Sequence, residues 1–329
     1  MATLYLTEQG TKLSRESNRL LVMRGEEKLL EVPVIKLERV QVYGHIQVTT
    51  QALELLLSSG IPVAFLAANG KLKGVLEPVR SKNIPLRLAQ YEKYRDEGFT
   101  LAIAKQIVSG KIRNQRRLIQ RFAHNRPQLD FRSQSCELER IMTEVERKTT
   151  LGGLLGLEGR ATAVYFEAYG QMFTELAFER RSRRPPLNPV NSLLSLGYTI
   201  LVQEFYSACS AAGFDPYLGF FHRLAYGRPA LALDLAEELR HPLIDMLTLD
   251  LANRRIITAA DFVTESGGFL LLPEARKRYF AKYERRVTIQ FKHPRTRAQT
   301  NVRQVIREQV QRMARAVQAG DTYEPFYIG

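Results

Sequence analysis

The sequence has few cysteines and no long apolar run, and each lack excludes a class of protein. Cys136 and Cys209 are the only cysteines in 329 residues, which are too few for a disulfide framework or a four-cysteine zinc site. No apolar run approaches the length of a membrane span. The opening MATLYLTEQGTKLSRESNRL lacks the charged, apolar and cleavage regions of a signal peptide. We therefore expect a cytoplasmic protein with no membrane partner.

Familiar catalytic motifs are absent as well. No serine lies in a G-x-S-x-G sequence, and the chain contains no Walker A loop, no H-E-x-x-H and no C-x-x-C. The sequence signatures of acyl hydrolases, P-loop enzymes, zinc proteases and dithiol redox proteins are therefore missing.

Acidic residues are outnumbered by basic ones. Lys and Arg total 48 against 34 Asp and Glu, which gives a formal net charge of +14. Such an excess attracts polyanions, and nucleic acid is the commonest of them. Basic residues cluster at 111–121, 178–186 and 275–286; Tyr279, Phe280 and Tyr283 interleave the last cluster, as expected if bases or sugars are contacted. One cluster alone is better explained as a solvated helix face, but three clusters favour a phosphate-binding surface.

The first 86 residues have the pattern of a small β domain. Short runs rich in β-branched or aromatic residues predict strands at 3–7, 19–25, 28–37 and 39–48. Asn69-Gly70 lies between two apolar runs and predicts a hairpin turn. One helix interrupts the strands at 49–60, with Thr49 or Thr50 as its N-cap.

From residue 87 onward the pattern is helical. Long segments repeat apolar residues at positions i, i+3 and i+4. The polar stretch 79–85 is the expected linker, and the basic, proline-bearing stretch 180–192 is an expected loop. We expect an α+β multidomain protein with a β domain at 1–86 and a helical domain at 87–329 that ends in a flexible tail.

Ionisable residues occur within the apolar stretch 218–239. His222 ends an apolar run, and Asp234 and Glu237 lie among leucines and alanines. Burying a charge costs free energy unless a counter-ion, a proton or a metal compensates for it. On a helix the two carboxylates lie one turn apart on the same face, so one is protonated or both share a cation. Glu158, after another apolar run, offers a further oxygen ligand.

The residue types leave two interpretations open. Carboxylates with an imidazole suit Mg²⁺ or Mn²⁺ better than a closed structural zinc site. Ordinary structural roles compete with this interpretation, because a partly buried Glu is commonly a helix cap or an ion-pair partner. A lone His beside phenylalanines is commonly a core residue.

Four ordered motifs carry a resemblance that covers both halves of the chain. They are LLGLEGRATAVYF, NPVNSLLSLGYTIL, GFDPYLGFFH and LALDLAEELR. In this order they resemble the CRISPR-associated adaptation integrase family, whose larger adaptation protein inserts new spacers into the repeat array. The resemblance implies a β-sandwich-like N-terminal domain that forms a homodimer, and a larger all-α catalytic domain.

The resemblance also implies a metal site. Mg²⁺ or Mn²⁺ would be held by Glu158, His222 and Glu237, with Asp234 as a supporting carboxylate or a ligand of a second metal. Members of the family often carry Asp where this chain has Glu237, and both residues supply a carboxylate oxygen.

Candidate contacts to nucleic acid complete what the resemblance implies. Asn191 and Tyr198 match the second motif, and Arg160 and Arg228 are expected to hold phosphates because they lie near the implied ligands in the sequence. In the implied reaction a DNA 3′-hydroxyl attacks a phosphodiester, and with water as the nucleophile the same site is an endonuclease. The implied partners are double-stranded and branched DNA and a small companion CRISPR adaptation protein. The alternative is a non-catalytic nucleic-acid-binding protein whose carboxylates form ordinary ion pairs.

Overall fold

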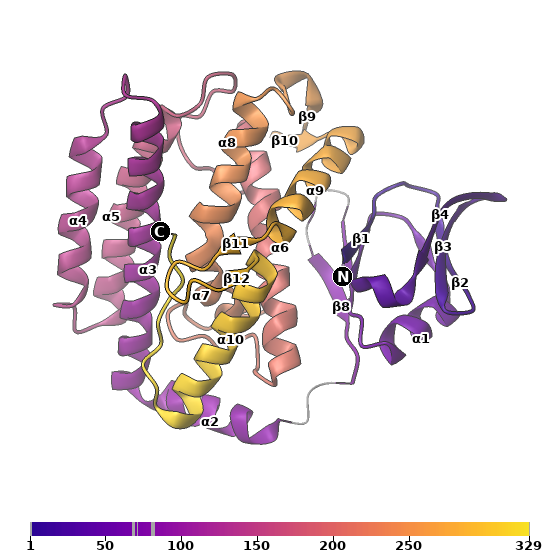
Figure 1. Cartoon of the computed structure of the whole chain (residues 1–329), viewed down its shortest axis with the longest axis horizontal. Coiled ribbons are helices and arrows are strands. Elements are labelled where there is room, and N and C mark those ends of the chain that lie inside the picture. The colour runs from indigo at the N-terminus through magenta and orange to yellow at the C-terminus, as the bar shows by residue number, and fades with distance from the viewer. Residues whose placement is uncertain (1, 68–69, 71, 80–82, 329) are drawn as a thin grey trace. The chain divides into compact units, whose positions relative to one another are not determined.

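The computed structural model describes residues 2–67, 70, 72–79 and 83–328 and contains two compact units (Figure 1). The first unit comprises Met1–Arg80 and Leu270–Glu284, and the second comprises Ser81–Phe269 and Arg285–Gly329. The boundary expected at residue 86 lies within the helix α2 (Ile84–Arg95). Asn69 of the expected hairpin turn and part of the expected linker lie outside the described residues.

Two four-stranded sheets form most of the first unit. One has the order β1-β5-β7-β8, in which β1, β5 and β7 are parallel and β8 is antiparallel to β7. The other has the order β4-β3-β2-β6, in which only β6 runs parallel to its neighbour. The strands are β1 (Ala2–Leu6), β2 (Lys12–Glu16), β3 (Arg19–Arg24), β4 (Glu27–Pro33), β5 (Leu37–Tyr43), β6 (Gln47–Val48), β7 (Val63–Leu66) and β8 (Leu72–Leu76).

One hydrophobic core joins both sheets to the helix α1 (Thr50–Ser58). Leu13 from one sheet, Val40 from the other and Leu56 from α1 are fully buried in it. Thr49 is the N-cap, because its hydroxyl accepts a hydrogen bond from the backbone N–H of Ala52. The predicted β-sandwich-like domain with a single helix inside its span is confirmed.

The first unit also contains most of α9 (Pro273–Thr288), which the sequence patterns did not assign to it. The Phe280 ring stacks on Tyr5 with 4.3 Å between the ring centroids. Tyr279 and Tyr283 are fully buried as well. The expectation that these aromatic side chains contact bases or sugars is therefore wrong. Their spacing of three and four residues places them together on the buried face of α9.

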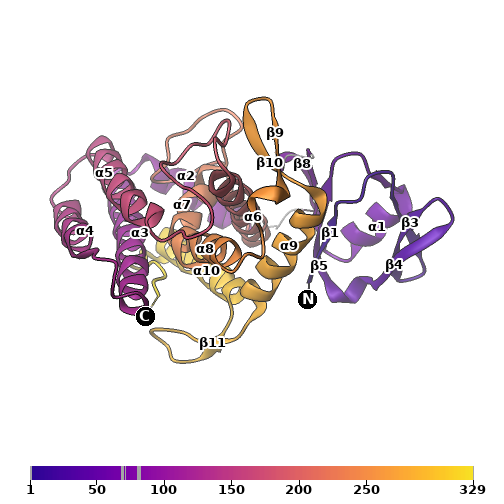
Figure 2. The same cartoon turned by 90° about the horizontal axis from the view of Figure 1, so that it is seen from above.

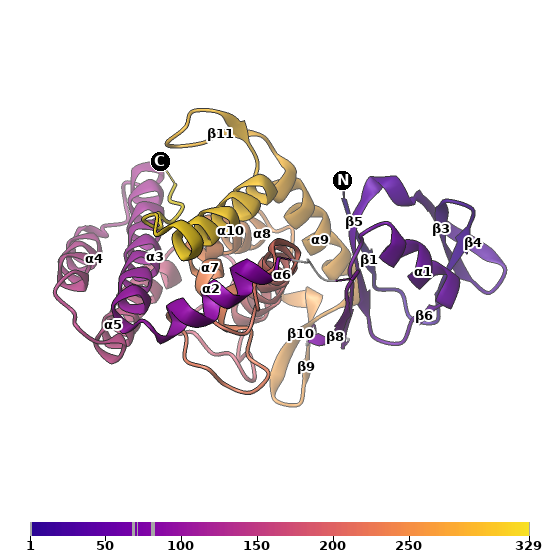
Figure 3. The same ribbon diagram turned by 90° about the horizontal axis from the view of Figure 1, so that it is seen from below.

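Helices make up most of the second unit, so the larger helical domain is confirmed. After α2 come α3 (Glu97–Asn125), α4 (Arg132–Val145), α5 (Leu151–Gly170), α6 (Pro189–Ala212), α7 (Ala230–Leu239), the π-helix η2 (Arg240–Asp245), α8 (Met246–Asn253) and α10 (Val302–Ala319). The long α3 packs against α4, α5 and α7 (Figure 2). On another side of the unit α10 packs against α2 and α6 (Figure 3).

Two short hairpins interrupt the helices and were not predicted. They pair β9 (Phe262–Glu265) with β10 (Gly268–Leu271), and β11 (Phe291–Lys292) with β12 (Gln299–Thr300). Strands of two to four residues are too short to leave an alternating pattern in the sequence. Within the described ranges, no helix combines the length and the apolar character needed to cross a membrane.

The chain end differs from the flexible tail that the sequence predicts. Residues 321–328, the C-terminal strap, have no regular structure, yet Tyr323 and Phe326 are buried. The backbone N–H of Phe326 donates to Glu238 Oε2 at 2.7 Å, and its carbonyl accepts from the side chain of Asn114. The strap is therefore fastened to α3 and α7 through its aromatic side chains and its backbone.

A buried carboxylate, lysine and histidine centre

Three helices bring Lys111, Glu158 and Glu237 together. Lys111 lies on α3, Glu158 on α5 and Glu237 on α7, and α3 packs against both of the other helices. The Lys111 ammonium contacts the Glu158 carboxylate, and its Nζ lies 2.7 Å from Glu237 Oε2. The side chains of Lys111 and Glu237 are only 5% and 2% exposed, so this is a buried ionic cluster.

Both carboxylates are held in their ionised form. Burial raises the pKa of Glu237, but Arg240 and Lys111 lower it by more, so its pKa lies well below the ordinary value. Arg240 Nη1 lies 3.2 Å from Glu237 Oε1. Burial also raises the pKa of Glu158, and Lys111 outweighs this effect. Two negative charges can therefore persist in a largely dry place.

Asp234 builds the loop that carries His222. Its carboxylate accepts the backbone N–H groups of Phe220, Phe221 and His222 at 2.6–2.9 Å, and it lies 2.6 Å from His222 Nδ1. A Cβ at Gly219 would lie 2.6 Å from Asp234 Oδ2, so the close approach requires glycine there. The arrangement fixes the imidazole with Nε2 turned toward Glu237, 3.7 Å from Oε1.

The spacing of Asp234 and Glu237 correctly placed both residues on α7, and both are buried. His222 lies near both carboxylates, with Nδ1 2.6 Å from Asp234 and Nε2 3.7 Å from Glu237. Asp234 is compensated by backbone N–H groups and by His222, whereas Glu237 is compensated by Lys111 and Arg240.

Tyr198 links the centre to the basic loop at 178–186. The guanidinium groups of Arg240 and Arg181 lie 5.0 and 5.5 Å from the centroid of its ring, and its hydroxyl donates to Asp245 Oδ1 at 2.6 Å. Arg240 and Asp245 begin and end the π-helix η2, an element that is frequent at functional sites.

Asn191 fastens the same loop. Its Oδ1 accepts from Arg181 Nη1 and from the backbone N–H of Ser182, and its Nδ2 donates to the Arg180 carbonyl. Asn191 is fully buried. In the structure its amide group is used within the protein, and the exposed cations beside it are Arg180, Arg183 and Arg184.

The two other predicted nucleic-acid contacts are Arg160 and Arg228. Arg160 projects from α5 toward α4, where Nη2 lies 2.7 Å from Glu144 Oε1 and Nε lies 3.7 Å from Glu137 Oε1. Arg228 lies on the exposed loop between His222 and α7. Arg160 is close to Glu158 in the sequence, but its side chain points to a different face of α5 and pairs with carboxylates of α4.

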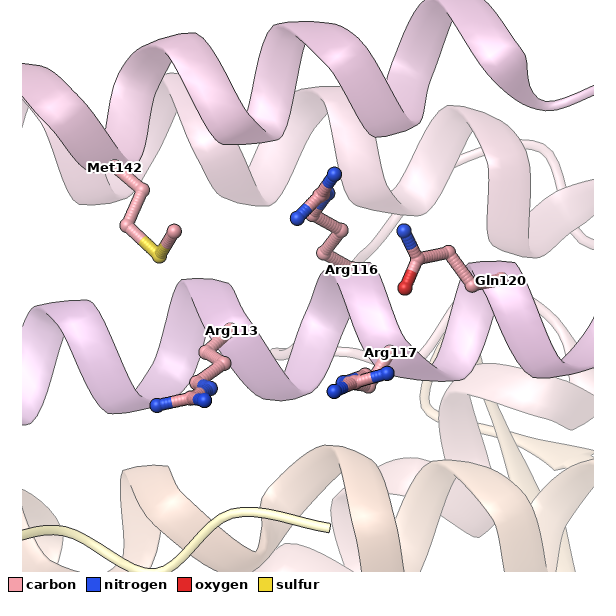
Figure 4. A pocket seen from close by; sticks show the side chains of 5 residues that line it. All are labelled: Arg113, Arg116, Arg117, Gln120 and Met142. Atoms are coloured by element: carbon pink, nitrogen blue, oxygen red, sulfur yellow. The ribbon is translucent and has the colours of Figure 1, made fainter. Parts of the chain in front are cut away.

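The cluster at 111–121 has two faces. Lys111 points inward to the carboxylates, while the outer face forms a pocket of about 430 Å³. Figure 4 shows the side chains that line it: Arg113, Arg116, Arg117, Gln120 and Met142. Arg116 pairs with Glu139 at 2.8 Å. Within the described part of the chain neither Arg113 nor Arg117 pairs with a carboxylate, so the pocket presents net positive charge.

The side chains of the centre fit a divalent metal chemically. Among the described residues, no group of three or more His, Cys, Asp or Glu side chains is already arranged around a metal position. Glu158 and Glu237 nevertheless enclose one cation, the Lys111 ammonium, and His222 Nε2 faces Glu237. Carboxylate oxygens with one imidazole nitrogen are ligands that suit Mg²⁺ or Mn²⁺.

Fold and centre together define a two-domain protein whose helical domain buries carboxylates, a histidine and a lysine beside arginine-rich surfaces. The family model described as CRISPR associated protein Cas1 matches residues 4–285. The chain belongs to this Cas1 family, which confirms the resemblance that the four motifs carry.

Individual relatives agree with this assignment. CRISPR-associated endonuclease Cas1 3 of Thermus thermophilus is 36% identical over 100% of this chain and 98% of its own length. The solved structure of a CAS1 protein from Thermotoga maritima is 25% identical, with a TM-score of 0.83 over 96% of this chain and 97% of that chain. A chain of a Cas6-RT-Cas1–Cas2 complex is 27% identical, with a TM-score of 0.84 over 98% of this chain and 36% of that chain.

Proposed function

We propose that this protein is a divalent-metal-dependent DNA endonuclease and integrase that inserts new spacer DNA into a CRISPR array. One observation carries the proposal: Glu158, His222 and Glu237 come from three separate segments to one buried place that accommodates a cation. An ordinary ion pair needs neither the histidine nor the Asp234 loop that orients it. The relative from Thermus thermophilus is named an endonuclease, which supports the same activity here.

The residues divide the chemical work among themselves. Glu158, His222 and Glu237 would hold Mg²⁺ or Mn²⁺, which when bound neutralises phosphate charge and acidifies a nearby hydroxyl. Asp234 keeps the His222 ring oriented through Nδ1. Arg240 lies against Glu237 and supplies positive charge where a phosphodiester under attack becomes more negative. Attack by a DNA 3′-hydroxyl forms a new phosphodiester and breaks the P–O bond of the target strand, whose own 3′-hydroxyl leaves; attack by water breaks the same bond and leaves the strand cleaved.

The surfaces around the centre suit a DNA backbone. Half-buried Arg181 of the loop at 178–186 lies over the ring of Tyr198, which also contacts Arg240, and the same loop carries the exposed Arg180, Arg183 and Arg184. The arginine pocket between α3 and α4 adds a second phosphate-binding surface. We infer that double-stranded and branched DNA are the substrates. Because a similar chain occurs in a complex with Cas2, we also infer a small companion adaptation protein, together with a homodimer of this chain.

The test compares single substitutions on one preparation of branched DNA. We expect His222→Ala and Glu158→Gln to reduce Mn²⁺-dependent strand joining and cleavage on the order of 100-fold or more, while DNA affinity changes by less than about threefold. The controls are His124→Ala and Glu167→Gln, which alter exposed side chains of α3 and α5. Melting temperatures show whether each variant is folded.

The same experiment distinguishes the enzyme from the alternative, a nucleic-acid-binding protein without catalytic activity. A nucleic-acid-binding protein without catalysis would show no joining or cleavage that depends on added Mn²⁺. A folded His222→Ala variant with full activity would remove this residue from the site.

A further inference from the structure

Lys111 and Arg240 together balance the charge of the two carboxylates at the centre. Glu158 and Glu237 contribute two negative charges, and the ammonium of Lys111 and the guanidinium of Arg240 contribute two positive ones. Asp234 is turned away toward backbone N–H groups and His222. Without a metal the carboxylates are therefore already neutralised.

The position of the ammonium is as informative as its charge. Lys111 Nζ contacts one oxygen of Glu158 and one of Glu237 at the same time. These are two of the three side chains that would hold the divalent ion. Within the described residues, Nζ forms ion pairs with these two carboxylates and with no other.

We infer that Lys111 is a resident cation that occupies the place of the divalent metal and must leave before the metal binds; this inference rests on the proposed function. A divalent ion bound between the same two carboxylates would repel the ammonium at contact distance and compete with it for their oxygens. Lys111 is thus a positioning residue. It holds Glu158 and Glu237 together in the metal-free protein and weakens the affinity for metal.

The decisive variant removes the charge of Lys111 while it keeps most of the volume. We expect Lys111→Met to lower the melting temperature in the absence of metal, because two buried carboxylates lose their counter-charge. We expect the same variant to bind Mn²⁺ at least tenfold more tightly than the parent protein by calorimetry. Mn²⁺ should also raise its melting temperature by more than that of the parent.

Two controls isolate the effect. Lys105→Met changes a lysine of the same helix whose Nζ donates to the Glu146 carbonyl, and it should leave Mn²⁺ affinity at the parent value. Lys111→Arg keeps the positive charge and should not show the gain in affinity.

A measurement on the parent protein needs no variant. Lys111 is 4% exposed, so an amine-acylating reagent should modify it slowly without metal. When Mn²⁺ displaces the ammonium toward solvent, mass spectrometry should show at least fivefold faster modification of Lys111 and an unchanged rate at Lys105. If Lys111→Met fails to fold, this labelling result decides alone.

The outcomes separate the inference from the proposed function. If neither the parent nor Lys111→Met binds Mn²⁺, the metal site and with it the proposed function are wrong. If the parent binds Mn²⁺ but Lys111→Met binds it no more tightly, or Lys111 remains protected in the Mn²⁺-bound parent, the resident-cation inference is overturned and the proposed function stands.

Discussion

At the scale of single residues, two adjacent glutamates on α7 have opposite electrostatic surroundings. Glu237 faces Lys111 and Arg240, which hold its pKa below the ordinary value despite burial. Glu238 is also fully buried, and burial raises its pKa to about 7, with hydrogen bonds from Tyr323, Phe326 and Gln309 offsetting only part of the effect. One helix thus carries neighbouring carboxyl groups whose pKa values are shifted in opposite directions, down for Glu237 and up for Glu238.

The raised pKa of Glu238 should make the free energy of unfolding depend on pH. Its pKa is raised in the folded state, so between about pH 4.5 and 7 the folded protein binds more protons than the unfolded chain, and rising pH lowers the free energy of unfolding. The shift from 4.5 to about 7 corresponds to roughly 3 kcal/mol. In urea unfolding, the parent protein should lose free energy of unfolding of this order between pH 5 and pH 8. Glu238→Gln should abolish that loss, whereas Glu92→Gln, which changes an exposed side chain of α2, should not. An unchanged pH slope in Glu238→Gln would contradict the raised pKa.

Replacing Asp234 should destabilise the protein and also disturb the orientation of the His222 ring. Asp234→Asn keeps one acceptor oxygen but loses the second, which leaves a buried backbone N–H without its partner; the expected cost is about 1–3 kcal/mol. Because Asn no longer offers His222 Nδ1 a charged acceptor, Mn²⁺-dependent cleavage should fall by more than tenfold in variant protein that is still folded. Asp250→Asn, on the partly exposed end of α8, is the matched control. Parent-level activity in folded Asp234→Asn would show that the His222 ring needs no such support.

The site residues show what sequence reasoning reaches and what it misses. His222, Asp234 and Glu237 were found because charge stood out in an apolar stretch. Lys111 was counted among surface cations of a basic cluster, since its partner Glu158 lies 47 residues away and on a different helix. No local pattern marks one lysine among five basic residues as the buried one; only the packing of α3 against α5 and α7 does so.

At the scale of elements, the two faces of α3 have different roles. Its inward face carries Lys111 and Asn114, and its outward face carries Arg113 and Arg117 one turn apart. The helical period separates these roles within a few residues. Since α3 also contacts the strap through Asn114, a single helix connects the basic pocket, the ionic centre and the chain end.

The outward face of α3 predicts a contribution to DNA binding. Arg113→Gln with Arg117→Gln should weaken binding of duplex DNA and reduce the slope of log affinity against log salt by about 2, if each arginine contacts one phosphate. The catalytic rate at saturating DNA should stay within about twofold of the parent value. Arg255→Gln, whose side chain pairs with Glu175, should leave the slope unchanged. A double variant with the parent slope would show that the pocket does not meet the backbone.

Regular elements were predictable where a pattern was long enough to be read. The helix α1 with its cap and the strands β1, β3, β4 and β5 follow the expected positions. The strand β2, KLSRE, has one fully buried residue and no alternation of apolar and polar residues that would mark it. The place of α9 depends on Phe280 packing on Tyr5, a contact between opposite ends of the sequence, and no periodicity within α9 could indicate its partner.

At the scale of the whole molecule, apolar surface on the first unit supports a homodimer. Ile35 is 82% exposed and Leu30 is 44% exposed, and both lie at or just after β4, an edge strand of its sheet. An exposed edge with apolar side chains is a common place for chain pairing. We therefore expect this edge to contribute to self-association.

Ile35→Glu tests the dimer on the full chain. We expect it to raise the dimer dissociation constant at least about 30-fold, equivalent to about 2 kcal/mol, as measured by light scattering over a range of concentrations. Val263→Glu alters an apolar residue of similar exposure to Leu30 on β9 and should leave the dimer intact. A parent protein that stays monomeric at high concentration would refute the dimer itself.

The C-terminal strap has a consequence for the order of events during biosynthesis. Tyr323 and Phe326 supply donors to Glu238, and Pro325 lies so close to Gly110 that a Cβ there would be 2.6 Å from its own Cβ. Residues 321–328 leave the ribosome after every helix and strand described above. The first unit also needs a late segment, Leu270–Glu284, to complete its packing, and the contacts of Gly110 and Glu238, the neighbours of Lys111 and Glu237, form only when residues 321–328 have emerged. A nascent chain would thus lack part of the packing that supports the ionic centre until residues 321–328 have been made.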